Sequence, residues 1–239
     1  MPSPSISGSL SINEAGEVAF AAALTGTSGG TTDNAAIYKG NGASTVQLVR
    51  KGQFAPDGNG RYFELGLRQL VLNDRGEVLF HAALTGTTGG ATEGLFLAGG
   101  GQIRQIARLS HSAPGGGVFQ SFGRVMGLNN TGQIAFMATV DDGTTLSDGV
   151  FFHDGASLVE VVREGSVLPG FGTISTLIVS AQLEGEGRQE RSILNDFSQV
   201  VFTFIAGGQT GVALWTADTA IFSDGFESGS TTAWTTTVP

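Results

Sequence analysis

Short apolar stretches alternate along the whole chain with turns rich in glycine, asparagine and serine. In the stretch GEVLFHAAL, the residues Val78, Phe80, Ala82 and Leu84 occupy every second position and so share one face of a strand. The opposite face is also largely apolar, which is typical of a strand that is covered on both sides. Glycine supplies 38 of the 239 residues, and this density between short apolar runs indicates many tight turns. The pattern predicts an all-β protein.

The same pattern returns four times along the chain. An asparagine opens the turn after the first strand of each copy: Asn13, Asn73, Asn129 and Asn195. An aromatic residue marks the third strand: Tyr38, Phe96, Phe151 and Trp215. An arginine closes the last apolar run of three copies: Arg50, Arg108 and Arg163. The asparagines are 60, 56 and 66 residues apart, and three markers that keep step predict a repeat architecture.

Each copy contains the apolar runs of about four antiparallel strands, joined by short glycine-bearing turns. Inner strands that are apolar on both faces, with a more polar outer strand, are typical of a propeller blade packed between neighbouring blades. We therefore predict a β-propeller-like fold, either four-bladed or part of a larger propeller. An open stack of sheets is the alternative. The predicted repeat domain covers residues 1–218, and residues 219–239 form a C-terminal tail.

Two places depart from the repeat. The stretch ISGSLSI is expected to supply the first strand of copy one. Copy four lacks a clear last strand, unless the stretch near Ile221 provides one. In copy four, Ser198 replaces the glycine of the Asn-x-x-Gly turn, so this turn must differ or be strained. The polar tract Glu184–Arg191 is interpreted as an exposed loop.

Composition limits the classes of partner and of site that we expect for this protein. The formal net charge of -9 disfavours nucleic acid and an anionic membrane surface, because both attract basic proteins. The chain contains no cysteine, which excludes disulfides and thiolate metal sites. It has no apolar run of the roughly 18 residues that a membrane-spanning helix requires. We expect no membrane insertion, no nucleic-acid partner and a monomer.

The repeat resembles those of a large group of uncharacterised bacterial repeat proteins, most of them expected to be secreted. The shared elements are NEAGEVAFAAAL (Asn13–Leu24), GLF (Gly94–Phe96) and the turns RKGQFAPDG (Arg50–Gly58) and RLSHSAPGG (Arg108–Gly116). The usual aspartate of that turn is absent here. The stretch SDGFESGSTTAW (Ser223–Trp234) is similar to a tail that closes exported proteins of Gram-negative bacteria. The resemblance implies a secreted or extracytoplasmic protein and no particular activity.

The sequence contains no signature of catalysis. It has no G-x-S-x-G nucleophile elbow and no phosphate-binding loop, so its glycine clusters are interpreted as turns. The three histidines, His81, His111 and His153, fall at different places in their repeats, and ring symmetry does not bring them together. Asp141, Asp142 and Asp148 lack the spacing of a calcium loop. We predict no catalytic residues, no metal site and no cofactor.

The arginine series carries the one candidate binding site. Symmetry places Arg50, Arg108 and Arg163 at equivalent corners of successive repeats, where guanidinium groups suit carboxylates and acidic or sulfated sugars. His111 is added because it lies in the neighbouring loop. The competing interpretation, which we favour for the arginines, is that each one pairs with a local carboxylate or carbonyl and stabilises its turn.

Three functions remain open from the sequence. The first is a secreted or surface non-catalytic protein that binds a glycan or a protein. The second is an extracellular hydrolase of polysaccharide or ester bonds on the same scaffold, with its acid or base near Glu184–Arg191 or around His111. The third is a purely structural fragment whose partner segments are absent.

Overall fold

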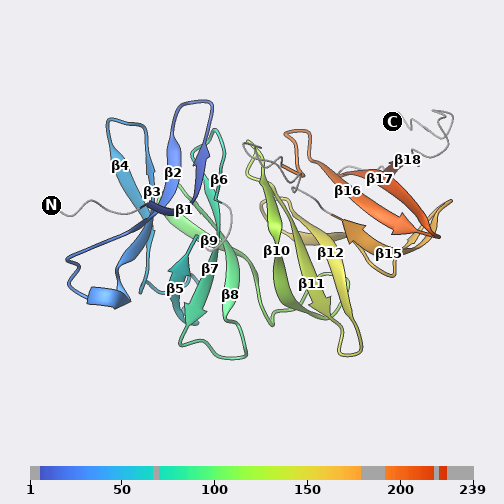
Figure 1. The fold of residues 1–239 in the computed structure, drawn as a ribbon, viewed down its shortest axis with the longest axis horizontal. Coiled ribbons are helices and arrows are strands. Elements are labelled where there is room, and N and C mark those ends of the chain that lie inside the picture. Colours follow the sequence, from blue (N-terminus) through green and yellow to red (C-terminus); the bar gives the residue numbers. More distant parts are fainter. Residues whose placement is uncertain (1–5, 67–69, 179–191, 218–220, 225–239) are drawn as a thin grey trace. The chain divides into compact units, whose positions relative to one another are not determined.

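A computed structural model describes residues 6–66, 70–178, 192–217 and 221–224 (Figure 1). The chain folds as two compact units, Met1–His111 and Ser112–Pro239. Each unit holds two of the four predicted repeats, and every repeat forms one antiparallel sheet. The described part of the chain contains no helix that is long and apolar enough to span a membrane.

The first unit consists of two sheets. The strands of the first sheet are β1 (Ile6–Ile12), β2 (Val18–Ala23), β3 (Ala35–Gly40) and β4 (Thr45–Arg50). A short 3-10 turn, η1 (Gly30–Thr32), lies in the loop between β2 and β3. The strands of the second sheet are β5 (Arg61–Leu65), β6 (Val71–Leu72), β7 (Val78–Thr85), β8 (Glu93–Gly99) and β9 (Gln102–Arg108). Strands β5 and β6 both pair with β7, so together they take the place of one first strand.

The second unit repeats this arrangement. The strands of its first sheet are β10 (Val118–Leu128), β11 (Ile134–Asp141), β12 (Leu146–His153) and β13 (Leu158–Arg163). The strands of its second sheet are β14 (Val167–Leu168), β15 (Gly172–Ile178), β16 (Gln199–Ala206), β17 (Gln209–Thr216) and β18 (Ile221–Asp224). Strands follow one another across each sheet in the order of the sequence, which is the meander of a propeller blade.

The all-β, propeller-like prediction is confirmed, as are two of its details. The stretch ISGSLSI forms β1, which pairs with β2 along the edge of the first sheet. The last sheet obtains its outer strand from Ile221–Asp224, which pairs with β17. The tract Glu184–Arg191 and the tail from residue 225 onward lie outside the described residues.

Each unit is held together by a core shared between its two sheets. In the first unit, Ala19 and Ile37 of the first sheet belong to one buried cluster with Val78 and Phe80 of the second. The small alanines on β2 allow the neighbouring sheet to approach closely, while the larger side chains come from β7 and β8. A second cluster joins the two sheets of the other unit, where Phe152 packs against Trp215 at a centroid distance of 5.0 Å. A single sheet has no such cover for both of its faces, which explains the long-range repeat.

The Asn turns fasten neighbouring sheets to each other. The Asn13 Oδ1 accepts the backbone N–H of Glu17 at 2.8 Å, and its Nδ2 donates to the Glu17 carboxylate at 3.0 Å. The same Nδ2 donates to the backbone carbonyl of Asn73, 60 residues further on, at 3.0 Å. In the second unit, Asn129 donates in the same way to the carbonyl of Asn195 at 3.1 Å. The asparagine therefore shapes its own turn and also bonds to the turn of the next repeat.

The substituted turn of the fourth copy keeps its conformation and is strained. Ser198 has a φ of 59°, in the region that glycine occupies at Gly16. Its N–H still donates to the Asn195 carbonyl, at 3.3 Å. The Ser198 hydroxyl donates to Gln133 of the preceding sheet at 2.7 Å, and this bond offsets part of the strain.

Candidate functional site

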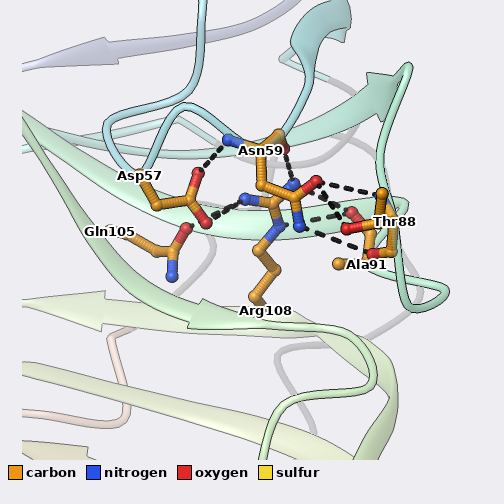
Figure 2. A network of polar contacts seen from close by, with 6 residues as sticks. All are labelled: Asp57, Asn59, Thr88, Ala91, Gln105 and Arg108. Atoms are coloured by element: carbon orange, nitrogen blue, oxygen red, sulfur yellow. Dashed lines mark hydrogen bonds and ion pairs between the residues drawn. The ribbon is translucent and has the colours of Figure 1, made fainter.

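The arginine that closes the second sheet, Arg108, is completely buried (Figure 2). Its Nη1 contacts the carboxylate of Asp57 at 2.5 Å, and its Nη2 donates to the backbone carbonyl of Asn59. Its Nε and Nη2 both donate to the carbonyl of Ala91, at 3.2 and 3.1 Å. The Asn59 side chain in turn accepts the N–H of Thr88 at 2.9 Å. The arginine thus joins the turn before β5 to the loop between β7 and β8.

Arg163, the arginine of the third sheet, holds the corresponding turn before its own sheet. It donates to the carbonyls of Pro114 at 2.8 Å and Gly116 at 3.0 Å, and it forms an ion pair with Glu160 at 2.5 Å. Its side chain is 12% exposed. In both repeats, therefore, the Ala-Pro turn that enters a sheet is bonded to the arginine that ends the same sheet.

Arg50, the arginine of the first sheet, differs from the other two. Its Nε donates to the backbone carbonyl of Asp33 at 2.8 Å, and its Nη2 pairs with the Asp33 carboxylate at 3.1 Å. Its Nη1 makes no hydrogen bond to the described residues, and the side chain is 30% exposed.

A groove of about 1090 Å³ lies beside Arg50 within the first unit. It is bordered by the loop between β2 and β3, the turn between β4 and β5, and the hairpin between β8 and β9. The lining residues are Ser28, Gly29, Thr32, Asp33, Leu48, Arg50, Lys51, Gly52, Gln53, Phe54, Pro56, Arg61, Gly101, Gln102 and Ile103.

Aromatic and cationic side chains are paired along this groove. Phe54 is 57% exposed, and the guanidinium carbon of Arg61 lies 3.5 Å from the centre of its ring. Arg61 is fixed from the other side because its Nη1 donates to the Gly52 carbonyl at 2.7 Å. The Nζ of Lys51 lies 4.9 Å from the centre of the half-exposed Phe63 ring. In such a cation–π contact the cationic group lies against the face of the aromatic ring and is attracted to it, while the rest of the ring remains exposed to solvent.

The charge of the groove is opposite to the charge of the chain as a whole. Three lining residues, Arg50, Lys51 and Arg61, are basic, and Asp33 is the one acidic member of the lining set. The Thr27 hydroxyl, the Gly29 N–H and the Arg50 guanidinium hold the pKa of Asp33 below its ordinary value. Asp33 therefore stays ionised near neutral pH and balances Arg50, which leaves Lys51 and Arg61 as the excess positive charge.

Sequence comparison places the chain in a family. A family model described as "Family of unknown function (DUF7453)" matches residues 4–219. The chain belongs to this family. No curated protein matches it in sequence.

Among solved structures, this DUF7453 protein is similar to one described as "Oligogalacturonate lyase in complex with manganese". The TM-score is 0.48 with 10% sequence identity, and the match covers 89% of this chain. The chain spans about half the length of that structure, at 51% of it.

The three histidines of this DUF7453 protein occupy unrelated environments. His111 lies exposed in the turn after β9, where its backbone N–H donates to the Arg108 carbonyl at 3.3 Å. His81 is buried on β7, with its Nε2 2.9 Å from the Glu93 carboxylate. His153 ends β12, and its Nδ1 accepts the N–H of Gly155 at 3.0 Å. No group of three histidine or acidic side chains among the described residues is arranged to hold a metal ion.

The carboxylates of the segment Asp141–Asp148 and of the Asn turns bond to residues of their own hairpins. Asp142 accepts bonds from the hydroxyls and backbone N–H groups of Thr144 and Thr145, and these bonds hold its pKa far below the ordinary value. Asp148 accepts the hydroxyl of Thr139 at 2.7 Å. Glu17 and Glu77 accept the side-chain amides of the asparagines that open their turns. These bonds are the ordinary stabilisation of turns in a β-rich protein.

Of the four candidate binding residues, Arg50, Arg108, Arg163 and His111, only Arg50 lies in the groove. Phe54, Arg61 and Lys51, which give the groove its chemistry, were not among those candidates. The sequence nevertheless contains a difference that marks them. The segment leading into the second sheet contains Phe54-Ala55-Pro56 and Arg61, whereas the corresponding segment before the third sheet has Val118 in place of Arg61.

Proposed function

We propose that this protein is a non-catalytic binding protein and that the groove of its first unit binds a saccharide. The observation that carries the proposal is the exposed Phe54 ring with Arg61 stacked on it, beside Arg50 and the amide side chains of Gln53 and Gln102. The C–H face of a sugar ring packs on an aromatic ring, while its hydroxyl groups bond to planar polar side chains.

The composition of the groove supports binding over hydrolysis. Most glycosidases place two carboxyl groups on opposite sides of the bond they cleave. In this groove Asp33 is the one carboxylate among the lining residues, and it is already paired with Arg50. The hydrolase hypothesis relied on His111 and on the tract Glu184–Arg191. His111 does not line the groove, and the tract lies outside the described residues.

We also propose that the protein acts outside the cytoplasm, as a monomer. The location is supported by the resemblance of the repeats to those of secreted bacterial proteins and by the tail Ser223–Trp234. Most of this tail lies outside the described residues. Extracytoplasmic proteins are the ones that meet polysaccharides of cell walls and matrices, so this location agrees with a saccharide ligand.

A glycan array probed with the purified chain tests the function, followed by titration calorimetry on the best ligand. We expect Phe54→Ala to weaken binding ~5-fold or more, because stacking on an aromatic ring contributes about 1 kcal/mol. Phe197→Ala is the matched control, since Phe197 is 80% exposed and is not one of the lining residues.

Three results contradict the proposal. The array shows no ligand; or Phe54→Ala binds as tightly as the unaltered chain; or the bound saccharide is cleaved during incubation, which instead supports the hydrolase alternative. Intact ligand recovered after the incubation, together with a loss confined to Phe54→Ala, supports binding.

A further inference from the structure

The hairpin between β3 and β4 is built around an Asn-Gly pair. Asn41 lies directly after β3, and both Asn41 and Gly42 are exposed. The Oδ1 of Asn41 accepts the backbone N–H groups of Ala43 at 3.1 Å and Ser44 at 3.0 Å, and it accepts the Ser44 hydroxyl at 3.4 Å. Asparagine commonly folds back on its own turn in this way. The bond to Ala43 closes a ring of atoms that contains both the Cγ of Asn41 and the backbone nitrogen of Gly42.

The backbone nitrogen of Gly42 is accessible to solvent and to base. Its N–H makes no hydrogen bond to the described residues. Gly42 has a φ of 86°, and a Cβ at this position would meet nothing within 4 Å. Because glycine has no side chain, nothing of its own shields the nitrogen either. An exposed amide carbon and an exposed nitrogen therefore lie next to each other in this hairpin.

The sequence contains one other Asn-Gly pair, Asn59-Gly60, and its groups are held differently. The Gly60 N–H already donates to the Gly58 carbonyl at 3.2 Å, and Gly60 is buried. The Asn59 side chain is bonded to the loop between β7 and β8, where it donates to the Thr88 carbonyl at 3.4 Å and accepts the Thr88 N–H at 2.9 Å (Figure 2). In this pair both the amide and the nitrogen are occupied by other partners.

We propose that Asn41 is a site of spontaneous modification, at which the side chain loses its amide nitrogen as ammonia. The Gly42 nitrogen bonds to the Cγ of Asn41, the bond from Cγ to Nδ2 breaks, and the proton of the Gly42 N–H leaves with the ammonia. Water then opens the resulting imide ring. Its addition at Cγ gives aspartate, and its addition at the backbone carbonyl carbon gives isoaspartate. The N–H groups of Ala43 and Ser44 stabilise the negative charge that develops on Oδ1 during the attack.

The third repeat shows a hairpin into which the aspartate product fits. The hairpin between β12 and β13 contains DGAS (Asp154–Ser157), where the hairpin of the first repeat contains NGAS (Asn41–Ser44). The Asp154 Oδ1 accepts the N–H groups of Ala156 and Ser157, both at 2.7 Å, and its Oδ2 accepts the Ser157 hydroxyl at 2.9 Å. These bonds are shorter than those at Asn41 because the acceptor is charged. Conversion of Asn41 to aspartate therefore keeps the hairpin and strengthens its bonds.

The test follows oxygen from water into the full chain. The purified protein is incubated at neutral pH in heavy-oxygen water and is then digested with trypsin in ordinary water. Trypsin cleaves after lysine and arginine, so the two Asn-Gly pairs fall on separate peptides, residues 40–50 and residues 52–61. We expect peptide 40–50 to gain heavy oxygen ~10-fold or more faster than peptide 52–61, a ratio that a small difference in activation free energy provides. Mass spectrometry measures the label, and chromatography separates the aspartate form from the isoaspartate form.

The variant that decides the role of the nitrogen is Gly42→Ala, which should slow the labelling of peptide 40–50 by ~10-fold or more because the added methyl group hinders the attack. Gly155→Ala, the same change in the hairpin of the third repeat, is the matched control and should leave that labelling unchanged. Thermal unfolding shows whether both variants are folded. If Gly42→Ala does not fold, Asn41→Gln replaces it, since its longer side chain keeps the amide but closes the ring far more slowly.

Each outcome supports or overturns the assignment. Labelling confined to peptide 40–50 and slowed in Gly42→Ala supports it. Equal labelling of the two peptides, or none in either, overturns the role of the hairpin, and labelling that persists in Gly42→Ala overturns the role of the Gly42 nitrogen. Asn41→Asp reproduces the aspartate product, and we expect its midpoint of thermal unfolding to equal or exceed that of the unaltered chain. A lower midpoint would show that the product does not adopt the hairpin of the third repeat.

Discussion

Arg50 and Arg108 end the same strand of two successive sheets, yet one lies half-exposed beside a groove and the other is completely buried. Their backbone positions are equivalent, since Arg50 pairs with Ala36 and Arg108 with Gly94 in the register of the last two strands. Both donate through Nε to a carbonyl 17 residues earlier, that of Asp33 or of Ala91. The difference lies in what approaches from the other side.

Arg108 receives the turn that contains Asp57 and Asn59, and this turn supplies its carboxylate. Arg50 receives its carboxylate from Asp33, in the loop between β2 and β3. Equivalent guanidinium groups therefore bond to different segments in the two repeats, and the exposure of their side chains differs as well.

Replacing each arginine by glutamine should give the largest difference between the two repeats. We expect Arg108→Gln to lower the free energy of unfolding by about 3–5 kcal/mol, because the arginine is buried and the carbonyls of Asn59 and Ala91 and the Asp57 carboxylate lose their donor. Arg50→Gln should cost about 1 kcal/mol or less, since its ion pair is partly exposed. Urea unfolding of the two variants measures both values. Similar losses for the two would mean that burial does not distinguish the arginines.

The turn that covers Arg108 provides a smaller but more specific test. Gly60 has a φ of 97°, and a Cβ at this position would lie 2.9 Å from the Thr85 carbonyl. Gly58, in the same turn, has a φ of 73° but faces open space. We expect Gly60→Ala to cost about 2–3 kcal/mol and Gly58→Ala about 1 kcal/mol, because only the first adds a clash to the backbone strain.

Thermal or urea unfolding of the two glycine variants provides the measurement. If both variants lose the same amount, the turn can move away from the loop between β7 and β8. Such freedom would contradict the close packing that makes Arg108 inaccessible.

The pH dependence of stability tests the contribution of the Asp33 carboxylate in the first repeat. The pKa of Asp33 lies below its ordinary value of 3.8, so the ionised carboxylate stabilises the folded chain. This contribution is present above pH 3.8 and is lost as the pH falls through the lower folded value. We expect Asp33→Asn to be less stable than the unaltered chain at pH 7 and to show a shallower loss as the pH falls below 4. Parallel stability curves for the two proteins would show that the Asp33–Arg50 pair contributes nothing.

Much of the fold could be predicted from the sequence because its signals are local. Alternating apolar residues indicate the strands, glycines indicate the turns, and the number of recurring asparagines indicates the number of sheets. The sequence did not reveal that Asn13 donates to the carbonyl of Asn73, because this bond depends on how closely two sheets approach. For the same reason, the strain at Ser198 was foreseen but its bond to Gln133 was not.

The candidate site was less accessible to sequence reasoning. The series of arginines was recognisable in the sequence. The repeat pattern does not distinguish its three members, although their side chains range from fully buried to 30% exposed. The exposure of an arginine depends on which distant segments pack around it, and no local pattern in the sequence records that packing. Phe54 and Arg61 appeared to be ordinary turn residues. Their importance arises only when the loop between β2 and β3 and the β8–β9 hairpin complete the groove.

A substitution at Tyr62 has the smallest expected effect. It tests whether the second and third repeats are equivalent, rather than how two repeats differ. It is buried on β5 and contacts Phe96 edge-on at 5.2 Å, just as Phe119 on β10 contacts Phe151 at 5.0 Å. Burial raises the pKa of Tyr62, and its hydroxyl makes no hydrogen bond to the described residues.

Because a buried hydroxyl without a partner costs free energy, Tyr62→Phe should leave stability unchanged or raise it by up to about 1 kcal/mol. Urea unfolding at neutral pH measures the change, and Phe119→Tyr in the third repeat is the reverse substitution, expected to lose about 1–3 kcal/mol. A loss in Tyr62→Phe would mean that the hydroxyl supports the neighbouring Arg108–Asp57 pair. In that case the second repeat would depend on a polar contact that the third repeat lacks, because the third repeat has Phe119 at the equivalent position.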